Sequence, residues 1–458
     1  MSEEMKKDLA TENINTDAGY TDRAVPLDQR RTWPSMTFAW FGAAMFVGLY
    51  YSGVELGSSM GTLNTALLAI LCGCVFLAGF VTLNGIMGYK TGCTAALIGR
   101  YSYGSRGAAI PGFHVTDTGW NIMSTAQIAV ILAAIFPVID MRVFCVLCSV
   151  LFLTNSFIGF KAMVTLNKFA MPILLLTGLY GLFRLHVITD GGLMAVFGMQ
   201  QEQTIALGAG ITIVVGTWVS GSSRAADYFR FAKSTKDTVI AACVGFFAGL
   251  IICLVIAAFW GAGIGAGEIV PTLTTLGGGM MFFGFIMFTL QTWTTNEHNG
   301  FVTSNAIPAC TKAVWGRERI KRSTTVAIMI ILCIIFCGFG VEKIFTPFLS
   351  VLGTFLPAIG AISIADFYIM SRTNYHWTGH KHYYNFDVND PEVEHHKFNP
   401  STIPGILAGV LVGFLLDWGI AAVNSMVTSI VVYCICCILL SGVRKKEAAK
   451  NKVVEGRK

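Results

Sequence analysis

Polar residues interrupt an apolar run of the sequence near residue 117, and they are the first side chains that could do chemistry. The stretch reads Asp117, Thr118, Gly119, Trp120 and Asn121. If this run crosses a membrane, a carboxylate inside it is costly unless it is paired or used, so Asp117 is a functional candidate by default. The alternative interpretation is an ion pair or a hydrogen bond that only holds the helix bundle together.

A second group of polar and aromatic residues surrounds Trp218, which is flanked by Thr217 and Ser220. Trp120 lies three residues after Asp117, on nearly the same helix face. Two indoles with hydroxyls, an amide and a carboxylate suit a flat heteroaromatic ring that has donors and acceptors along its edges. Such a ring stacks between indoles much as bases stack on aromatic side chains. Anchoring at the lipid interface is the alternative for a single tryptophan, but Trp120 lies too deep in its run for that role.

A third candidate site lies in the run LQTWTTN, where Thr294 and Thr295 follow Gln291 by one helical turn. Their hydroxyl oxygens could join backbone carbonyls of an unwound helix to coordinate a hard monovalent cation. Threonine also bonds back to carbonyls of its own helix, and spacing alone does not separate the two interpretations.

Membrane-spanning helices must position all these residues. Hydrophobic residues make up 54% of the chain and charged residues 13%, whereas a soluble domain has about 25% charged residues. A spanning helix needs about 20 mostly apolar residues. The stretch from Thr91 to Gly107 is too amphipathic to be a spanning helix, and we expect it to form an interfacial helix. Twelve spans are predicted, at 35–56, 62–87, 109–136, 141–160, 164–184, 205–229, 238–262, 278–299, 323–341, 346–371, 401–418 and 420–441.

Two of these spans are rich in glycine and serine. The first contains Gly42 and Gly48, and the sixth contains Gly216 and Gly221 beside serines. Such clusters let a helix unwind at membrane depth if the freed backbone groups line a cavity or bind a ligand. The two spans are five helices apart, which places them at matching positions of two inverted halves. Close helix packing is the alternative, and the matching positions favour the break, with Trp218 at the break of the sixth span.

The charge distribution predicts the orientation of the chain. With a cytoplasmic N-terminus, all 32 lysines and arginines fall on the cytoplasmic side except Arg142, Arg184 and Lys343. Both termini are therefore expected in the cytoplasm, and residues 1–34 contain no signal peptide. Because membrane topology explains the net charge of +6, no nucleic-acid partner is indicated.

The histidines do not point to an enzyme. The segment 372–400 could clasp zinc, but a solvated loop is the favoured interpretation because thiol and carboxylate partners are missing. A membrane-embedded enzyme would need a nucleophile–base pair or a metal site at depth, and His114, near one end of the third span, suits a structural hydrogen bond. The histidines of the loop are His376, His380, His382, His395 and His396.

Three runs of the sequence resemble the nucleobase:cation symporter-1 family. They are GYKTGCTAALIGRYSYGSRGA, GTWVSGSSRAADYFRF and QTWTTNEHN, in the family's order and spacing. The resemblance extends from about Trp33 to Arg444 and is closest to the bacterial cytosine permease branch.

This resemblance implies a sodium-coupled importer with the five-plus-five inverted-repeat fold of the leucine-transporter type and two additional C-terminal helices. By position in the family's motifs, the residues that would contact the substrate are Trp120, Trp218, Asp117, Gly216 through its backbone, Thr217, Ser220 and Gln291. The sodium ligands would be the carbonyl oxygens of Gly42, Met45 and Gln291 and the hydroxyls of Thr294 and Thr295.

Three residues depart from the cytosine permease pattern: Asp117 replaces a glutamine, Gln291 an asparagine and Trp218 a phenylalanine. These changes concern substrate selection, so cytosine is the first candidate, followed by a purine, a hydroxymethylpyrimidine, a hydantoin or allantoin. Asp117 could accept hydrogen bonds from a base or titrate and make transport proton-coupled. A sensor that binds solute without moving it is a further alternative.

The expected organisation is a cytoplasmic tail (1–34), a ten-helix transport core (35–371), a cytoplasmic loop (372–400), two accessory helices (401–441) and a basic tail (442–458). We expect a monomer in the cytoplasmic membrane, with a nucleobase, a sodium ion or proton, and the lipid bilayer as partners, and no cofactor besides the transported ion.

Overall fold

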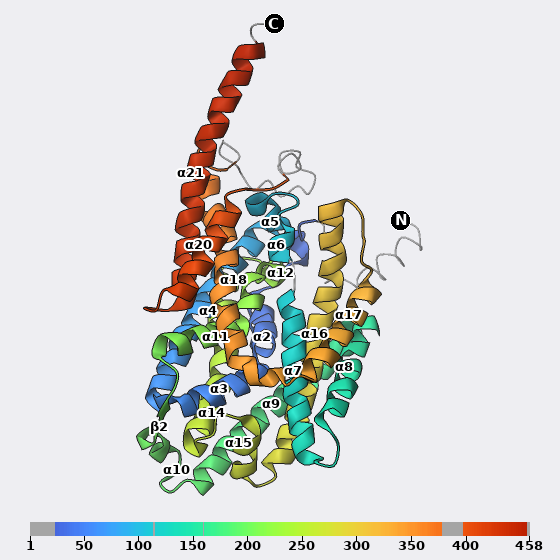
Figure 1. The fold of residues 1–458 in the computed structure, drawn as a ribbon, viewed down its shortest axis with the longest axis vertical. Helices are drawn as coiled ribbons and strands as arrows, with labels where there is room; N and C mark the ends of the chain where they lie inside the picture. The colour runs from blue at the N-terminus through green and yellow to red at the C-terminus, as the bar shows by residue number, and fades with distance from the viewer. Residues whose placement is uncertain (1–22, 113–114, 159, 378–396, 456–458) are drawn as a thin grey trace.

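The protein is described by a computed structural model that covers residues 23–112, 115–158, 160–377 and 397–455. Helices make up nearly all of this part of the chain (Figure 1). The longer ones are α2 (Trp33–Ala44), α3 (Val47–Ser59), α4 (Leu63–Thr91), α5 (Ala95–Tyr103), α7 (Val115–Ile135), α8 (Met141–Ile158), α9 (Phe160–Ile188), α11 (Leu207–Ser223), α14 (Phe247–Ile264), α15 (Ile269–Leu276), α16 (Met280–Trp315), α17 (Arg322–Cys337), α18 (Phe345–Tyr368), α20 (Thr402–Leu415) and α21 (Ala421–Glu455).

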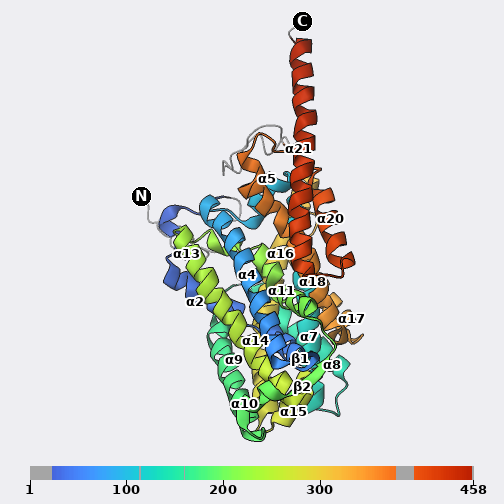
Figure 2. The same cartoon turned by 90° about the vertical axis from the view of Figure 1, so that its left-hand side faces the viewer.

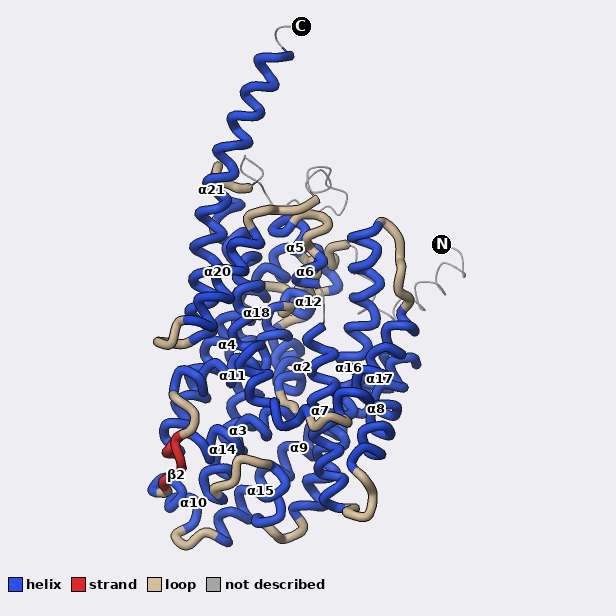
Figure 3. Tube along the Cα trace, in the orientation of Figure 1, coloured by secondary structure: helices blue, strands red, loops and turns tan. Residues whose placement is uncertain are grey.

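Short helical segments connect these helices. They are η1 (Leu27–Gln29), α6 (Ala109–Gly112), α10 (Gly192–Ala195), η2 (Val196–Gly198), α12 (Ala226–Phe229), α13 (Thr235–Ile240), the π-helical segment η3 (Ala241–Phe246), η4 (Val341–Ile344) and η5 (Met370–Arg372). Two strands, β1 (Met60–Thr62) and β2 (Gln200–Gln203), pair antiparallel with Met60 opposite Gln203. Figure 3 shows this pair at the end of the described molecule opposite α5.

The helices suit a protein that crosses the membrane several times. Six of the described helical segments are long and apolar enough to span a bilayer, and α2 with α3 would add a seventh. Four shorter apolar helices accompany them, within α8, α11, α17 and α20. Each of the twelve spans expected from the sequence contains at least one helix, but the number of crossings stays a prediction.

The first expected span is broken, as predicted. The axes of α2 and α3 differ in direction by 60°, and the break falls at Met45 and Phe46, whose backbones are extended. Gly42 lies inside α2 and Gly48 inside α3, so the glycines flank the break rather than form it. The interruption frees backbone carbonyls at the middle of the span, which a bilayer tolerates only where protein or a cavity surrounds them.

The sixth expected span is interrupted at a different place from the one predicted. Helix α11 continues through Gly216, Trp218 and Gly221 and ends at Ser223, and a turn at Arg224 separates it from α12. A Cβ atom on Gly216 would lie 2.0 Å from the carbonyl oxygen of Leu349 in α18. Gly216 therefore allows α11 and α18 to approach closely. Close helix packing was the alternative to a helix break in the sequence analysis.

Two peripheral parts of the fold frame the core. Helix α5, in the stretch expected to be interfacial, has nine residues, too few to span a bilayer. Thr94 caps its N-terminus by accepting a hydrogen bond from the Leu97 backbone N–H. Helices α20 and α21 pack beside α18, and α21 projects beyond the end of the molecule that carries α5 (Figures 1 and 2).

Candidate functional site

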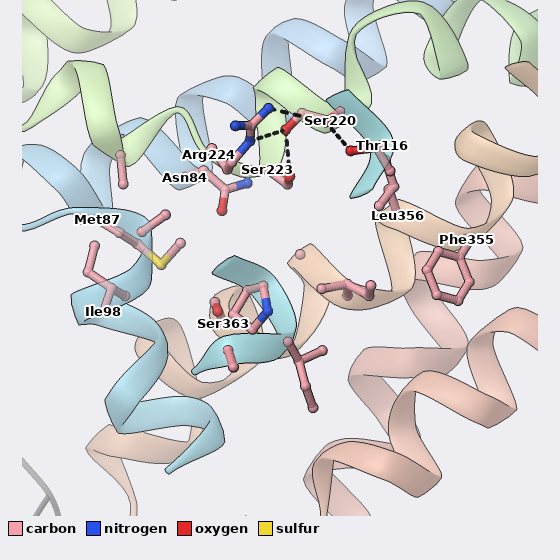
Figure 4. Close-up of a pocket in the computed structure, with 17 residues that line it drawn as sticks. Asn84, Met87, Ile98, Thr116, Ser220, Ser223, Arg224, Phe355, Leu356 and Ser363 are labelled. Atoms are coloured by element: carbon pink, nitrogen blue, oxygen red, sulfur yellow. Dashed lines mark hydrogen bonds between the residues drawn. The ribbon is translucent and has the colours of Figure 1, made fainter. Parts of the chain in front are cut away.

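A cavity of about 540 Å³ lies where α11 ends, between the middle of the molecule and the end that carries α5. Its wall is formed by parts of α4, α5, α6, α7, α11, α12 and α18, and most of the lining side chains are apolar (Figure 4). The polar residues of the wall are Asn84, Thr116, Ser220, Ser223, Arg224 and Ser363.

The polar side of the cavity is organised by an ion pair between Asp117 and Arg224. The Arg224 Nη2 atom lies 2.8 Å from Oδ1 of Asp117, which is 2% exposed. The Ser220 hydroxyl lies 3.4 Å from the same carboxylate oxygen and 2.9 Å from the Thr116 hydroxyl. Arg224 Nε also donates to the backbone carbonyl of Ser220 at 3.3 Å. Figure 4 shows the guanidinium and the two hydroxyls meeting at the cavity wall.

Arg224 is the most important residue that the sequence analysis missed. It lies in the run GSSRAADYF, where it counted only as one more positive charge on the cytoplasmic side. The signal was an arginine at the inner edge of a span that also holds candidate site residues, opposite a carboxylate that needs a partner. Asp117 thus forms an ion pair, which the sequence analysis gave as the alternative to a functional role.

The two tryptophans both point into the protein, toward the break in the first span. Trp120 is 7% exposed and Trp218 is half-buried. The Trp218 Nε1–H donates to the carbonyl oxygen of Ala44 at 2.9 Å, so the sixth span is tied to the last residue of α2. The Phe46 ring lies against both indoles, with ring centroids 5.4 Å from Trp120 and 5.9 Å from Trp218.

The remaining predicted substrate residues are buried near the same helices. The Thr217 hydroxyl donates to the Val214 carbonyl oxygen at 2.7 Å, within α11. Gln291 is buried in α16. Gly216 does not offer freed backbone groups, because it lies inside the continuous helix α11.

The predicted cation ligands lie in α2, at the break that follows it and in α16, and the site stays a prediction. Thr294 is buried and its hydroxyl donates to the Gln291 carbonyl oxygen at 2.9 Å, the back-bonding that was the alternative to ion binding. Thr295 is half-buried one residue on. Gly42 lies close to Met171 of α9, and buried Met45 lies close to Gly249 of α14.

A polar cluster between α7 and α16 was also missed. The Ser124 hydroxyl donates to Oδ1 of Asn296 at 2.6 Å, and Asn296 Nδ2 donates to the Thr125 hydroxyl at 2.8 Å. Asn121 lies one turn earlier on α7, with both amide atoms buried and no hydrogen-bond partner among the described residues. The spacing of residues 121, 124 and 125 marks one helix face, and this pattern could have revealed the cluster.

Of the histidines considered for a metal site, only His376 belongs to the described part of the chain. It is buried, and its Nε2 atom lies 3.1 Å from Oδ1 of Asp366. Within the described residues, no three histidine, cysteine or acidic side chains come together as metal ligands. The other histidines of that loop, His380, His382, His395 and His396, lie outside the described residues, and so does His114, for which a structural hydrogen bond was expected.

The chain is similar to known permeases over nearly its whole length. The family described as permeases for cytosine/purines, uracil, thiamine and allantoin matches residues 24–437. The cytosine permease of Escherichia coli strain K12 is 26% identical over 366 residues, which cover 79% of this chain and 84% of the relative.

Solved structures share the fold. The inward-facing conformation of Mhp1 superposes with a TM-score of 0.75 at 18% identity, covering 93% of this chain and 94% of Mhp1. Mhp1 closed around bromovinylhydantoin, described as a nucleobase-cation-symport-1 family transporter, gives a TM-score of 0.70 at 18% identity, covering 92% and 96%. The fold, the family match and the similarity to a cytosine permease agree with the resemblance found in the three sequence runs. The chain therefore belongs to the nucleobase:cation symporter-1 family of membrane permeases and is close to the bacterial cytosine permeases.

Proposed function

We propose that this protein imports a nucleobase across the cytoplasmic membrane together with sodium, by alternating access, and that cytosine is the first candidate substrate. The observation that carries the proposal is the convergence of Trp120 and Trp218 on the break of the first span. The cavity begins nearby, since it is lined by Thr116, one helical turn before Trp120, and by Ser220, two residues after Trp218. A flat ring gains stacking from indoles on either side, and polar side chains at its edge give specificity.

In this proposal the ring stacks between Trp120 and Trp218. Asp117, Thr217, Ser220 and Gln291 read its edges, with Arg224 added by the ion pair. Sodium is bound by carbonyl oxygens of Gly42, Met45 and Gln291 and by the hydroxyls of Thr294 and Thr295. Such a site orders the broken helix when the ion binds, which couples the ion to the substrate.

The proposed membrane arrangement has both termini in the cytoplasm and twelve spans. Residues 35–371 form the transport core, and residues 401–441 form the two accessory helices. With this orientation the cavity lies on the cytoplasmic side of the tryptophans, since α5 and α6 contribute to its wall. It then serves as the path by which the base leaves the site.

The stacking assignment is tested by Trp120→Ala. Stacking of a base on an aromatic side chain contributes about 1–3 kcal/mol, so cytosine binding should weaken by roughly fivefold to 150-fold. Binding is measured by thermal shift of the purified protein with cytosine, uracil, hypoxanthine, hydantoin and allantoin, each with and without sodium, because a ligand stabilises the state it binds.

Trp418→Ala is the matched control, since Trp418 is 72% exposed near the start of α21. Wild-type affinity in Trp120→Ala would refute the stacking role. A shift for a ring other than cytosine would keep the transporter assignment and change the substrate.

Proton coupling is the second candidate, because Asp117 is a buried carboxylate beside the cavity. The pairing with Arg224 supports sodium instead, since an adjacent guanidinium stabilises the ionised carboxylate. In proteoliposomes, Thr294→Ala should remove the sodium dependence of cytosine uptake. Uptake driven by a pH gradient alone in the wild type, unchanged in Thr294→Ala, would favour the proton. A variant that keeps its sodium dependence would refute Thr294 as a sodium ligand.

A further inference from the structure

Phe46 lies at the break of the first span, where the chain leaves one helix and enters the next. Its backbone is extended, with φ −149° and ψ 164°, so it lies outside both helices, although its carbonyl oxygen accepts a hydrogen bond from the Leu49 N–H of α3 at 3.2 Å. The side chain is 8% exposed. A buried aromatic ring on a non-helical residue can turn or shift without unwinding a helix.

The Phe46 ring is the common neighbour of the two tryptophans. It meets Trp120 at an interplanar angle of 84° and a centroid distance of 5.4 Å. It meets Trp218 at the same angle and 5.9 Å. These are favourable edge-to-face arrangements for aromatic rings. A ring of the protein thus contacts both indoles between which the proposed function places the substrate ring.

Gly48 provides the room for this arrangement. A Cβ atom at this position would lie 2.4 Å from Cε2 of Phe46 and 3.2 Å from Cζ3 of Trp120. Any larger residue at the start of α3 would push the Phe46 ring out of its position against Trp120. The absence of a side chain at Gly48 thus allows the Phe46 ring to pack against Trp120.

We propose that Phe46 is a residue of the substrate site whose ring takes the substrate's place between Trp120 and Trp218 when the carrier is empty. The inference rests on the proposed function. A transporter that works by alternating access must return without substrate, and an unfilled gap between two indoles would leave an apolar void. Voids destabilise a packed protein in proportion to their volume. The Phe46 ring removes that cost on the empty return and is displaced when a base binds.

The test compares two assays of radiolabelled cytosine in proteoliposomes. Net uptake driven by a sodium gradient requires the empty carrier to return, whereas counterflow into vesicles preloaded with unlabelled cytosine does not. In Phe46→Ala we expect net uptake to fall about tenfold, equivalent to about 1.4 kcal/mol in the barrier, while the initial rate of counterflow stays near wild type. Binding of cytosine should become tighter, because no ring has to be displaced.

Two further variants make the test specific. Phe348→Ala removes a ring that meets Trp120 at 5.4 Å and 81° and does not pair with Trp218 among the described contacts, so net uptake and counterflow should change in parallel. Phe46→Leu restores most of the volume, and net uptake should recover most of its rate. If Phe46→Ala does not fold, Phe46→Val takes its place, with a smaller fall in net uptake and an unchanged initial rate of counterflow.

Equal losses of net uptake and counterflow in Phe46→Ala would overturn the proposal, and so would unchanged net uptake or weaker cytosine binding. The wild-type protein tests the proposed function separately. If the wild type shows no sodium-driven uptake of cytosine, the proposed function is refuted. If the wild type takes up cytosine normally and Phe46→Ala loses net uptake and counterflow in parallel, only the proposed role of Phe46 is refuted.

Discussion

Among the described residues, the buried carboxylates of Asp117 and Asp366 lie next to an arginine and a histidine respectively, and their surroundings differ. Asp117 in α7 pairs with Arg224 at 2.8 Å, and the Arg224 side chain is 14% exposed and lines the cavity. Asp366 in α18 lies 3.1 Å from His376, and both side chains are fully buried. A pair that borders a cavity can exchange a partner with a solute, whereas an enclosed pair can only join the elements that supply it.

The elements joined by Asp366 explain its role. The Tyr433 hydroxyl of α21 donates to Asp366 Oδ1 at 2.6 Å. Asn399 Nδ2 donates to the Tyr433 oxygen at 3.1 Å and to the carbonyl oxygen of Ser102 in α5 at 2.7 Å. Helices α21, α18 and α5 therefore meet in one polar network. Burying such groups is tolerated when their partners are in place, so this network should stabilise the protein without contacting the substrate.

The largest expected effect separates the two pairs. Arg224→Ala leaves the Asp117 carboxylate buried without its guanidinium, and breaking a buried pair in this way costs about 3–5 kcal/mol. We expect cytosine uptake in proteoliposomes to fall by roughly 100-fold or more, together with the melting temperature.

The control is Arg319→Ala, which removes an arginine from the exposed loop between α16 and α17 where it lies over Trp315. If Arg224→Ala takes up cytosine near the wild-type rate, the pair of Asp117 and Arg224 has no more part in transport than the enclosed pair of Asp366 and His376. Pairing Arg224→Gln with Asp117→Asn should restore the melting temperature but not uptake, because the buried charge is gone while the groups that read the substrate remain changed.

A smaller effect is expected at the enclosed pair. Tyr433→Phe removes the hydrogen bond to Asp366 and should lower the free energy of unfolding by about 1.5–3 kcal/mol, the usual contribution of a hydrogen bond to a charged group. Thermal unfolding measures the loss, and cytosine affinity should stay at the wild-type value. Tyr368→Phe is the matched control, since its hydroxyl donates only to the Leu83 carbonyl and a neutral bond contributes about 1 kcal/mol. A large change in cytosine affinity in Tyr433→Phe would contradict the structural role.

The smallest expected effect sharpens the description of the cavity side. Ser220→Ala removes a hydroxyl between Thr116 and Arg224, worth about 1 kcal/mol. We expect KM for cytosine to rise about fivefold with an unchanged melting temperature. Ser223→Ala removes a hydroxyl of the same cavity that donates only to the Ser220 backbone carbonyl, so KM should barely change. Equal effects in the two variants would mean that Ser220 does not contact the substrate.

The fold could be predicted in outline because the signals for it are local. The lengths of the apolar stretches predict helices, and the structure places a helix in each predicted span. The break in the first span was predicted from glycines, yet it occurs at Met45 and Phe46. The break in the sixth was placed too early, at Gly216 and Trp218, because a glycine that frees a helix and one that packs against Leu349 have the same local sequence signal.

The candidate site could be predicted only as a set of residues. Asp117, Trp120 and Trp218 stand out because polar and aromatic groups inside apolar runs are unusual. Their partners do not stand out in the sequence, because Arg224 is 107 positions from Asp117 and Phe46 belongs to a different span from either tryptophan. Helical periodicity relates residues a few positions apart, and it carries no information on which side chains from separate helices meet.

The sequence by itself determined that this protein is a multi-helix membrane permease of the nucleobase:cation symporter-1 family. The lengths of the apolar stretches and the family's three motifs are local features of the sequence, and no contact between distant residues is needed to detect them. Only the tertiary structure decided that Asp117 is paired with Arg224, that Phe46 contacts both indoles and that Gly216 packs instead of unwinding. Each of these depends on distances between helices, which the packing of side chains and backbones sets once the chain has folded.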